Sequence, residues 1–233
     1  MYFRQWGSNG PAVVLVHGHV VSSRYMVPLG EALAPHCRVF APDLPGSGKS
    51  PKPPRALDIP QLADALGDFI VARGLDSPVL IGNSMGCQII CDLVTRKGMA
   101  GRVVLQSPTT DGRARKLYVL LGRFFRSAIH EQRLIPLAAI YLSDLAQAGP
   151  FRSWDTLQFM LRDRIEDKRV DVPALIVRGE YDFIVPDSWV RHLAEVWPNA
   201  SLLTLAGVAH GLHYSATELF VDAILPFVTG EPA

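Results

Sequence analysis

Residues 79–90 read Val-Leu-Ile-Gly-Asn-Ser-Met-Gly-Cys-Gln-Ile-Ile, an apolar run that enters a Gly-x-Ser-x-Gly pentad and continues as a helix-length pattern. This order predicts a buried strand, a sharp turn and a helix, the context in which a strained turn exposes a serine hydroxyl. Gly82 and Gly86 carry no side chain, so strand and helix can approach each other closely. Taken alone, the pentad also fits a serine N-cap in a glycine-rich loop. Ser84 as a nucleophile is therefore a hypothesis that needs partners.

Candidate partners for Ser84 follow it in the chain. A serine hydroxyl is a weak nucleophile near neutral pH and needs a base that a third group orients. Asp182 lies in a turn just after one apolar run, and Glu180 is the alternative acid. His210 follows the next apolar run and is the predicted base, with His213 as the alternative. The order Ser, acid, His predicts a catalytic triad of Ser84, Asp182 and His210.

Acyl transfer also needs N–H groups directed at the oxygen that becomes negative. The predicted helix begins at Met85 and points its free N–H groups at Ser84, so the Met85 N–H is one expected donor to this oxyanion hole. A loop after the first long apolar run should supply the second donor, and His19 is predicted there, with Val20 as the alternative. His17 is expected to stabilise the turn.

Short apolar runs alternate with helix-length amphipathic stretches along most of the chain. The expected strands are residues 12–17, 37–41, 78–81, 103–105, 174–177 and 201–205. The expected helices are residues 24–34, 59–73, 85–97, 188–196 and 217–228. Continuous apolar strands are typical of a parallel sheet that is covered on both faces, and the alternation gives right-handed crossovers. The sequence therefore predicts an α/β fold with a mostly parallel, doubly wound sheet.

One segment, residues 109–169, breaks this alternation. It shows no strand pattern, but it contains helical patterns at residues 117–128, 134–145 and 154–164. A connection of this length without secondary structure is uncommon inside a compact domain. We expect a helical cap here, inserted into a single domain whose core comprises residues 1–108 and 170–233.

The predicted cap contains large apolar side chains at helical spacing. Phe124, Trp154 and Phe159 are expected, together with Val20, to bind substrate, although the same spacing suits the core of the cap itself. A basic cluster lies in the same segment and consists of Arg113, Arg115, Lys116, Arg123, Arg126 and Arg133. It could serve an anionic substrate or an acyl carrier, and a solvated face is the simpler interpretation.

Composition and charge argue against several classes of protein. The 233 residues are 48% hydrophobic and 19% charged, which is typical of a globular enzyme and not of a disordered chain. The net charge of +1 gives no electrostatic footprint for nucleic acid or an anionic membrane. No signal-peptide pattern opens the sequence, and three cysteines without a CxxC pair predict reduced thiols, so we expect a cytoplasmic location. Nothing indicates the oligomeric state.

Nucleotide and metal chemistry find little support. Residues 46–50 resemble the end of a phosphate-binding P-loop, but that motif requires glycine where Asp43 stands, and prolines follow at 51, 53 and 54. The seven histidines show no H-x-x-x-H or H-E-x-x-H spacing. We therefore expect no metal and no other cofactor.

Several motifs together resemble those of the α/β-hydrolase superfamily over nearly the whole chain. They are residues 17–19, residues 43–50, the Ser84 pentad, the Asp182 turn and His210. The Gly-Asn-Ser-Met-Gly pentad is similar to that of small bacterial esterases and of meta-cleavage-product hydrolases, which cleave carbon–carbon bonds. The chain departs from the latter at Cys87, where they usually carry glycine, and we expect the usual N-terminal hairpin to be largely missing.

The resemblance implies an enzyme of the α/β-hydrolase fold with a nucleophile elbow at Ser84. We expect a serine hydrolase that cleaves a small carboxylic ester, or a related acyl substrate, through an acyl-enzyme. Three alternatives stay open: a carbon–carbon bond hydrolase of a meta-cleavage-type dienoate, perhydrolysis on the same triad, and a non-catalytic ligand-binding protein of the same fold. In each case the partner is a small molecule.

Overall fold

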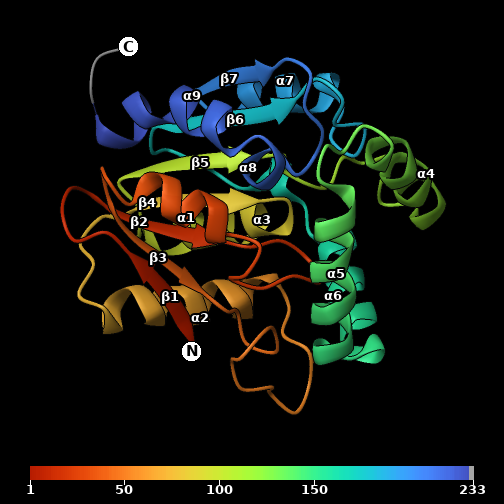
Figure 1. The fold of residues 1–233 in the computed structure, drawn as a ribbon, viewed down its shortest axis with the longest axis horizontal. Coiled ribbons are helices and arrows are strands. Elements are labelled where there is room, and N and C mark those ends of the chain that lie inside the picture. The colour runs from red at the N-terminus through yellow and green to blue at the C-terminus, as the bar shows by residue number, and fades with distance from the viewer. Residues whose placement is uncertain (231–233) are drawn as a thin grey trace.

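The computed structural model describes residues 1–230, which contain one seven-stranded sheet (Figure 1). Its strands are β1 (Phe3–Trp6), β2 (Ala12–Val16), β3 (Arg38–Pro42), β4 (Val79–Asn83), β5 (Arg102–Gln106), β6 (Ala174–Gly179) and β7 (Ala200–Leu205). Their spatial order is β1-β3-β2-β4-β5-β6-β7. β1 runs antiparallel to β3, whereas the pairs from β3 to β7 are parallel. The predicted α/β class is confirmed, and β1 is a strand that the sequence did not predict.

Helices connect the strands along the chain. They are α1 (Val27–Leu33), α2 (Ile59–Ala72), α3 (Met85–Lys97), α4 (Leu117–Ala128), α5 (Leu134–Ala148), α6 (Pro150–Arg162), α7 (Asp187–Val196), α8 (Leu212–Ser215) and α9 (Thr217–Thr229), with a 3-10 turn, η1 (Ile165–Asp167). Local signals fix several ends. Asp58 and Gln61 form a reciprocal capping box at the start of α2, and Gly98 ends α3 in the left-handed conformation with φ 62°.

Alternate strand residues pack against opposite layers of helices. Val13 and Leu15 of β2 lie in the core formed with α1 and α9, whereas Val14 and Val16 lie in the core formed with α2, α3 and α7. Because successive side chains of a strand point to opposite faces, a fully apolar strand fills both cores. This packing explains why β2 is buried along its whole length.

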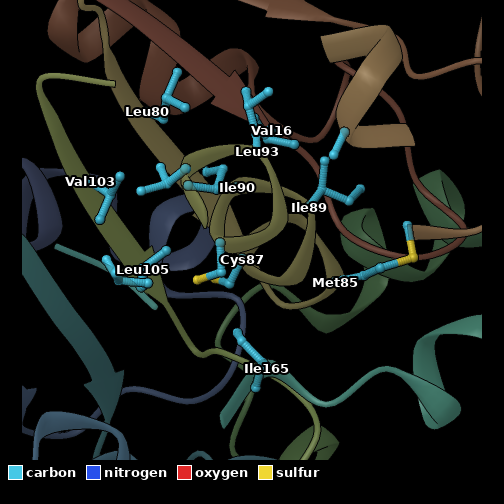
Figure 2. Close-up of a cluster of buried hydrophobic side chains, with 14 of the residues drawn as sticks. Val16, Leu80, Met85, Cys87, Ile89, Ile90, Leu93, Val103, Leu105 and Ile165 are labelled. Carbon is cyan, nitrogen blue, oxygen red and sulfur yellow. The ribbon is translucent and has the colours of Figure 1, made fainter. Parts of the chain in front are cut away.

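The second of these cores surrounds the start of α3. Figure 2 shows Cys87 and Ile90 of α3 close to Leu105 and Val103 of β5 within this apolar cluster. The Cys87 thiol is buried, and the carbonyl oxygens of Gly82 and Gln106 lie 3.2 and 3.3 Å from its sulfur and share its one S–H donor. Cys87 therefore acts as a small buried side chain that holds the first turn of α3 against β4 and β5.

The three helices α4, α5 and α6 follow one another between β5 and β6, and we call residues 117–162 the α4–α6 segment. Figure 1 shows these helices gathered at the end of the sheet toward which the arrows of β5 and β6 point. Helix α6 begins four residues earlier than predicted, because Gly149, at φ 89°, ends the preceding helix and Pro150 occupies the first helical position. Of the helices in the described part of the chain, none has the length and apolar character needed to cross a membrane.

A glycine substitution tests the close approach of α3 to β2. A Cβ on Gly86 would lie 2.3 Å from the carbonyl oxygen of Val16, so we expect Gly86→Ala to lower the free energy of unfolding by about 1–3 kcal/mol. Gly122, in the exposed middle of α4, has nothing within 4 Å of its Cβ position. Gly122→Ala is the control and should raise the free energy of unfolding by roughly 0.5–1 kcal/mol. Urea denaturation measures both, and equal effects would contradict the packing argument.

Candidate active site

Ser84 occupies the turn between β4 and α3. Its backbone angles are φ 54° and ψ −118°, a conformation that residues other than glycine rarely adopt. The Ser84 N–H donates a hydrogen bond of 3.0 Å to the carbonyl oxygen of Gln106 at the end of β5. A strained residue that neighbouring elements hold in place is typical of a functional position. The turn places Ser84 directly before the N-terminus of α3.

Asp182 and His210 form a buried pair in the loops that follow β6 and β7. The His210 Nδ1–H donates to Asp182 Oδ2 over 3.0 Å, and Asp182 is completely buried. This bond leaves Nε2 of the imidazole as the nitrogen that can accept a proton. Within residues 1–230 no hydrogen bond joins the Ser84 hydroxyl to His210, although both residues line one cavity. In enzymes without substrate, catalytic hydrogen bonds of this kind are often long.

The turn after β6 holds Asp182 in place through its backbone. Asp182 Oδ1 accepts hydrogen bonds from the N–H groups of Ile184 and Val185, each at 3.1 Å. The buried Arg178 donates to the carbonyl oxygens of Asp182 and Val185, at 3.2 and 3.1 Å. The two N–H groups bind one oxygen of the buried carboxylate and His210 binds the other, whereas Arg178 fixes the backbone of the turn, so the acid has one available orientation.

The charges of the pair shift the pKa of each partner. Burial by itself would raise the pKa of Asp182, but the charge of His210 and the hydrogen bond to it hold this pKa below its ordinary value. Burial by itself would lower the pKa of His210, but the charge and hydrogen bond of Asp182 raise it above its ordinary value. An ionised acid beside a base of raised pKa stabilises the imidazolium form.

The loop after β2 lies against Ser84. A Cβ built on Gly18 would lie 3.3 Å from the Ser84 Cβ, which places the backbone of this loop beside the nucleophile candidate. Val20 has a φ of 59°, an uncommon value for a β-branched residue. The His19 side chain donates from Nε2 to the Ser153 carbonyl oxygen of α6 over 2.8 Å, and burial lowers its pKa below the ordinary value. His19 is therefore neutral and fixed to the α4–α6 segment.

His17 connects this loop to the segment that begins at Asp43. Its Nδ1–H donates to the Gly18 carbonyl oxygen over 2.9 Å, and its Nε2 accepts from the Leu44 N–H over 3.1 Å. Asp43 accepts from the N–H groups of Ser23 and Lys49, each at 2.7 Å. The segment that resembles a P-loop is thus a turn organised around a carboxylate, and His17 has the structural role that the sequence predicted.

A cavity of about 510 Å³ opens over Ser84 and His210, and we call it the serine chamber. Its walls include Gly18, His19, Val20, Asn83, Ser84, Thr109, Leu117, Leu120, Leu121, Phe124, Tyr141, Leu142, Leu145, Pro150, Ser153, Trp154, Leu157, Met160, Ile184 and His210. This volume lies in the range of small-molecule sites. Three of the predicted substrate-binding residues, Val20, Phe124 and Trp154, therefore lie at the same cavity as Ser84.

The structure places other candidates away from this chamber. Phe159 is not among the described wall residues, because Ser153, Leu157 and Met160 occupy the face of α6 toward the chamber and Phe159 lies on another face. The Met85 side chain borders a small neighbouring pocket instead, which leaves its backbone N–H as the group of interest.

The alternative acid and base have other partners. The Glu180 side chain accepts a hydrogen bond of 2.9 Å from the Gly207 N–H at the surface. His213 is fully buried and packs edge-on against the Tyr25 ring at 4.2 Å, and burial followed by the charge of His210 lowers its pKa to about 3. Neither side chain is placed to replace Asp182 or His210.

The basic cluster of the predicted cap also lies outside the walls of the serine chamber. Arg115 forms an ion pair with Glu166 and Arg123 with Asp111. The guanidinium of Arg126 lies over the Phe183 ring, 3.9 Å from its centre. These three arginines therefore support the packing of the segment.

Two side chains that the sequence did not single out anchor the base loop. Gln106, at the end of β5, donates from Nε2 to the His210 carbonyl oxygen over 2.9 Å. Glu131, just after α4, accepts from the Gly211 N–H over 3.1 Å and from the Ser215 hydroxyl. A polar residue at the end of a buried strand is a signal that could have indicated Gln106. The described residues contain no group of three or more His, Cys, Asp or Glu side chains that could hold a metal ion.

Comparisons with known proteins match this chain along most of its length. A family model described as "Alpha/beta hydrolase family" matches residues 13–223. A pimeloyl-[acyl-carrier protein] methyl ester esterase of Xanthomonas oryzae pv. oryzae (strain MAFF 311018) is 26% identical over 253 residues, covering 96% of this chain and 97% of that protein.

Solved structures share the fold. An esterase from Thermogutta terrifontis superposes with a TM-score of 0.82 at 22% identity, covering 98% of this chain and 93% of that one. The esterase EaEST from Exiguobacterium antarcticum gives a TM-score of 0.84 at 18% identity, covering 97% and 94%. With a family model that spans nearly the whole sheet and its helices, the chain belongs to the alpha/beta hydrolase family, and the predictions of fold and of a hydrolase are confirmed.

Proposed function

We propose that this hydrolase cleaves uncharged carboxylic esters with Ser84 as nucleophile, His210 as base and Asp182 as the acid that orients it. The observation that carries the proposal is the buried hydrogen bond between His210 Nδ1 and Asp182 Oδ2, at the edge of a chamber that also contains Ser84. A nucleophile, an orienting acid and a base that follow three strand ends in this chain order are the arrangement that acyl transfer requires.

The first half of the reaction forms an acyl-enzyme. His210 Nε2 accepts the Ser84 proton while Ser84 Oγ forms a bond to the carbonyl carbon of the ester. The carbonyl oxygen becomes negative and accepts hydrogen bonds from the N–H groups of Met85 and His19. When the carbon–oxygen bond to the leaving alcohol breaks, His210 passes the proton to that oxygen. The imidazolium needs the Asp182 carboxylate most at this stage.

The second half releases the acid and restores Ser84. A water molecule enters, and His210 accepts one of its protons as the water oxygen attacks the acyl carbon. The oxyanion forms again at the same N–H groups, the bond to Ser84 Oγ breaks and His210 returns the proton to Ser84. We also propose that the α4–α6 segment acts as the cap over this reaction, because its three helices contribute most of the apolar wall of the serine chamber.

The walls of the serine chamber favour an uncharged acyl group. Among its described residues there is no Asp, Glu, Lys or Arg, and His19 is held neutral by burial. A dienoate substrate carries a carboxylate, and the wall offers it no cation while His210 is neutral, the form in which His210 can act as a base, so its entry has a large desolvation cost. This argues for an ester and against the meta-cleavage alternative.

Replacement of the nucleophile gives the first test. Ser84→Ala should lower kcat for a p-nitrophenyl ester by at least about 10⁴-fold, because the attacking oxygen is removed. A fluorophosphonate probe should label the wild type and leave Ser84→Ala unlabelled. Ser8→Ala, at an exposed serine, is the matched control and should behave as the wild type. A folded wild type that the probe does not label would support the non-catalytic alternative.

The acid assignment has its own matched pair of substitutions. Asp182→Asn should lower kcat by about four orders of magnitude, because the amide no longer stabilises the correct His210 tautomer and the imidazolium. Glu180→Gln keeps an oxygen for the Gly207 N–H and should change kcat by less than about twofold. Steady-state kinetics of both variants decide the matter. A large loss of kcat in Glu180→Gln together with a small loss in Asp182→Asn would show that Glu180, and not Asp182, is the acid.

The pH dependence of kcat/KM should report the pKa of His210. Only neutral imidazole can accept the Ser84 proton, so kcat/KM should fall as the pH drops through the pKa of His210. Asp182 raises this pKa above its ordinary value of 6.5, so we expect the midpoint of the acid limb above 6.5. In Asp182→Asn the raising effect of the Asp182 charge is lost while burial still lowers the pKa of His210, so the midpoint should move below that of the wild type. Rates measured from about pH 5 to 9 test this, and a wild-type midpoint below 6.5 contradicts it.

A further inference from the structure

A second chamber, of about 490 Å³, adjoins the serine chamber. The residues common to both walls are Phe124, Tyr141, Leu142, Ile184 and His210. Ser84 and Val20 are described only in the wall of the serine chamber, whereas Gly211 and Glu131 are described only in the wall of the second chamber. His210 therefore stands at the boundary, with one chamber on each side.

The second chamber has an apolar interior. Helices α4 and α5 and the turn between them contribute Phe125, Ala128, Ile129, Leu134, Leu137 and Ala138. Two of its polar side chains have partners within the protein. The Ser127 hydroxyl accepts from the Phe183 N–H over 2.9 Å, and Glu131 accepts from the Gly211 N–H over 3.1 Å. The Tyr25 hydroxyl is buried and has no hydrogen-bond partner among the described residues, but apolar side chains form most of the wall. A mostly apolar chamber of this kind favours hydrocarbon over a sugar or a peptide.

The position of His210 tells which part of an ester enters which chamber. The leaving oxygen takes its proton from His210 Nε2, so it must lie within hydrogen-bond distance of this nitrogen, about 2.6–3.2 Å. In the proposed acyl-enzyme the acyl carbon is bonded to Ser84, so its chain begins in the serine chamber. The remainder of the alcohol must then continue past His210, and the adjoining space on that side is the second chamber.

We infer that the second chamber binds the alkyl chain of the leaving alcohol. The substrate class is then a neutral ester with an apolar chain on both sides of the ester bond. This inference rests on the proposed function, since it needs Ser84 as the nucleophile and His210 as the proton donor to the alcohol. It goes further because it assigns a binding site to the alcohol part of the ester, which the catalytic groups alone do not indicate.

Two isomeric esters test the assignment on the wild type. Hexyl acetate and methyl heptanoate carry the same hexyl chain on opposite sides of the ester bond, and methyl acetate lacks it on both. Acid release in a pH-stat gives kcat/KM for all three. We expect each long ester to exceed methyl acetate by at least about tenfold, because each chain finds its own apolar chamber. The inference would be overturned if methyl heptanoate is hydrolysed but kcat/KM for hexyl acetate is no higher than kcat/KM for methyl acetate.

Single substitutions then fill one chamber at a time. Ala138 lines the second chamber and Leu157 the serine chamber, and both side chains are half-buried. Ala138→Phe should lower kcat/KM for hexyl acetate by at least about tenfold and leave methyl heptanoate within about twofold, whereas Leu157→Phe should do the opposite. Ala128→Leu fills the second chamber from α4 and gives a second variant should Ala138→Phe fail to fold. Circular dichroism and thermal unfolding report folding in each case.

The outcomes separate the two proposals. If Ala138→Phe and Ala128→Leu slow methyl heptanoate and spare hexyl acetate, the chambers hold the opposite parts of the substrate and the inference is overturned. It is equally overturned if both variants leave the ratio of the two isomers unchanged. If the wild type and Ser84→Ala hydrolyse methyl acetate at the same rate, the failure lies with the proposed function instead.

Discussion

The close contact between α3 and β2 is the constraint on which the site depends. Gly86 places its Cα so near the Val16 carbonyl oxygen that no side chain fits between them. With the helix held this close to the sheet, the chain turns within one residue, and Ser84 adopts a φ of 54°. The strain fixes the hydroxyl at the N-terminus of α3, where free N–H groups of the helix also point. The ends of β5, β6 and β7 then bring the remaining groups to one edge of the sheet.

The α4–α6 segment contacts the loops that carry His19, Asp182 and His210. Helix α6 accepts a hydrogen bond from His19 in the donor loop. Ser127 binds the Phe183 N–H in the acid turn, and Glu131 binds the Gly211 N–H beside the base. The helices that form the walls of both chambers thus also hold the loops of the site. If the proposed function holds, a change in the packing of this segment should therefore alter both the walls of the chambers and the positions of these loops.

The positions of Ser84, Asp182 and His210 at the ends of strands could be predicted from the sequence because the signals that decide them are local. Asp182 and His210 each follow an apolar strand within a few residues, so their place at the sheet edge could be inferred from chain order. Phe159 could not be placed, because apolar residues cover more than one face of α6 and only packing shows that Met160 faces the chamber. Glu131 gave no signal, since its partner Gly211 lies 80 residues further along the chain. Long-range contacts of this kind emerge only from the folded structure.

The distribution of charge limits what the site can accept. Arg115 and Arg123 each form an ion pair with a carboxylate away from the serine chamber. The Asp182 carboxylate is paired with the His210 imidazole. The described wall of the serine chamber thus adds no charged side chain beyond this pair. In an apolar chamber hydrogen bonds act over a low effective dielectric, so backbone N–H groups stabilise a developing oxyanion strongly. A substrate that already carries a charge would have to lose its hydration on entry, whereas a neutral ester becomes charged only at the reacting carbonyl, where the proposal places the N–H groups of Met85 and His19.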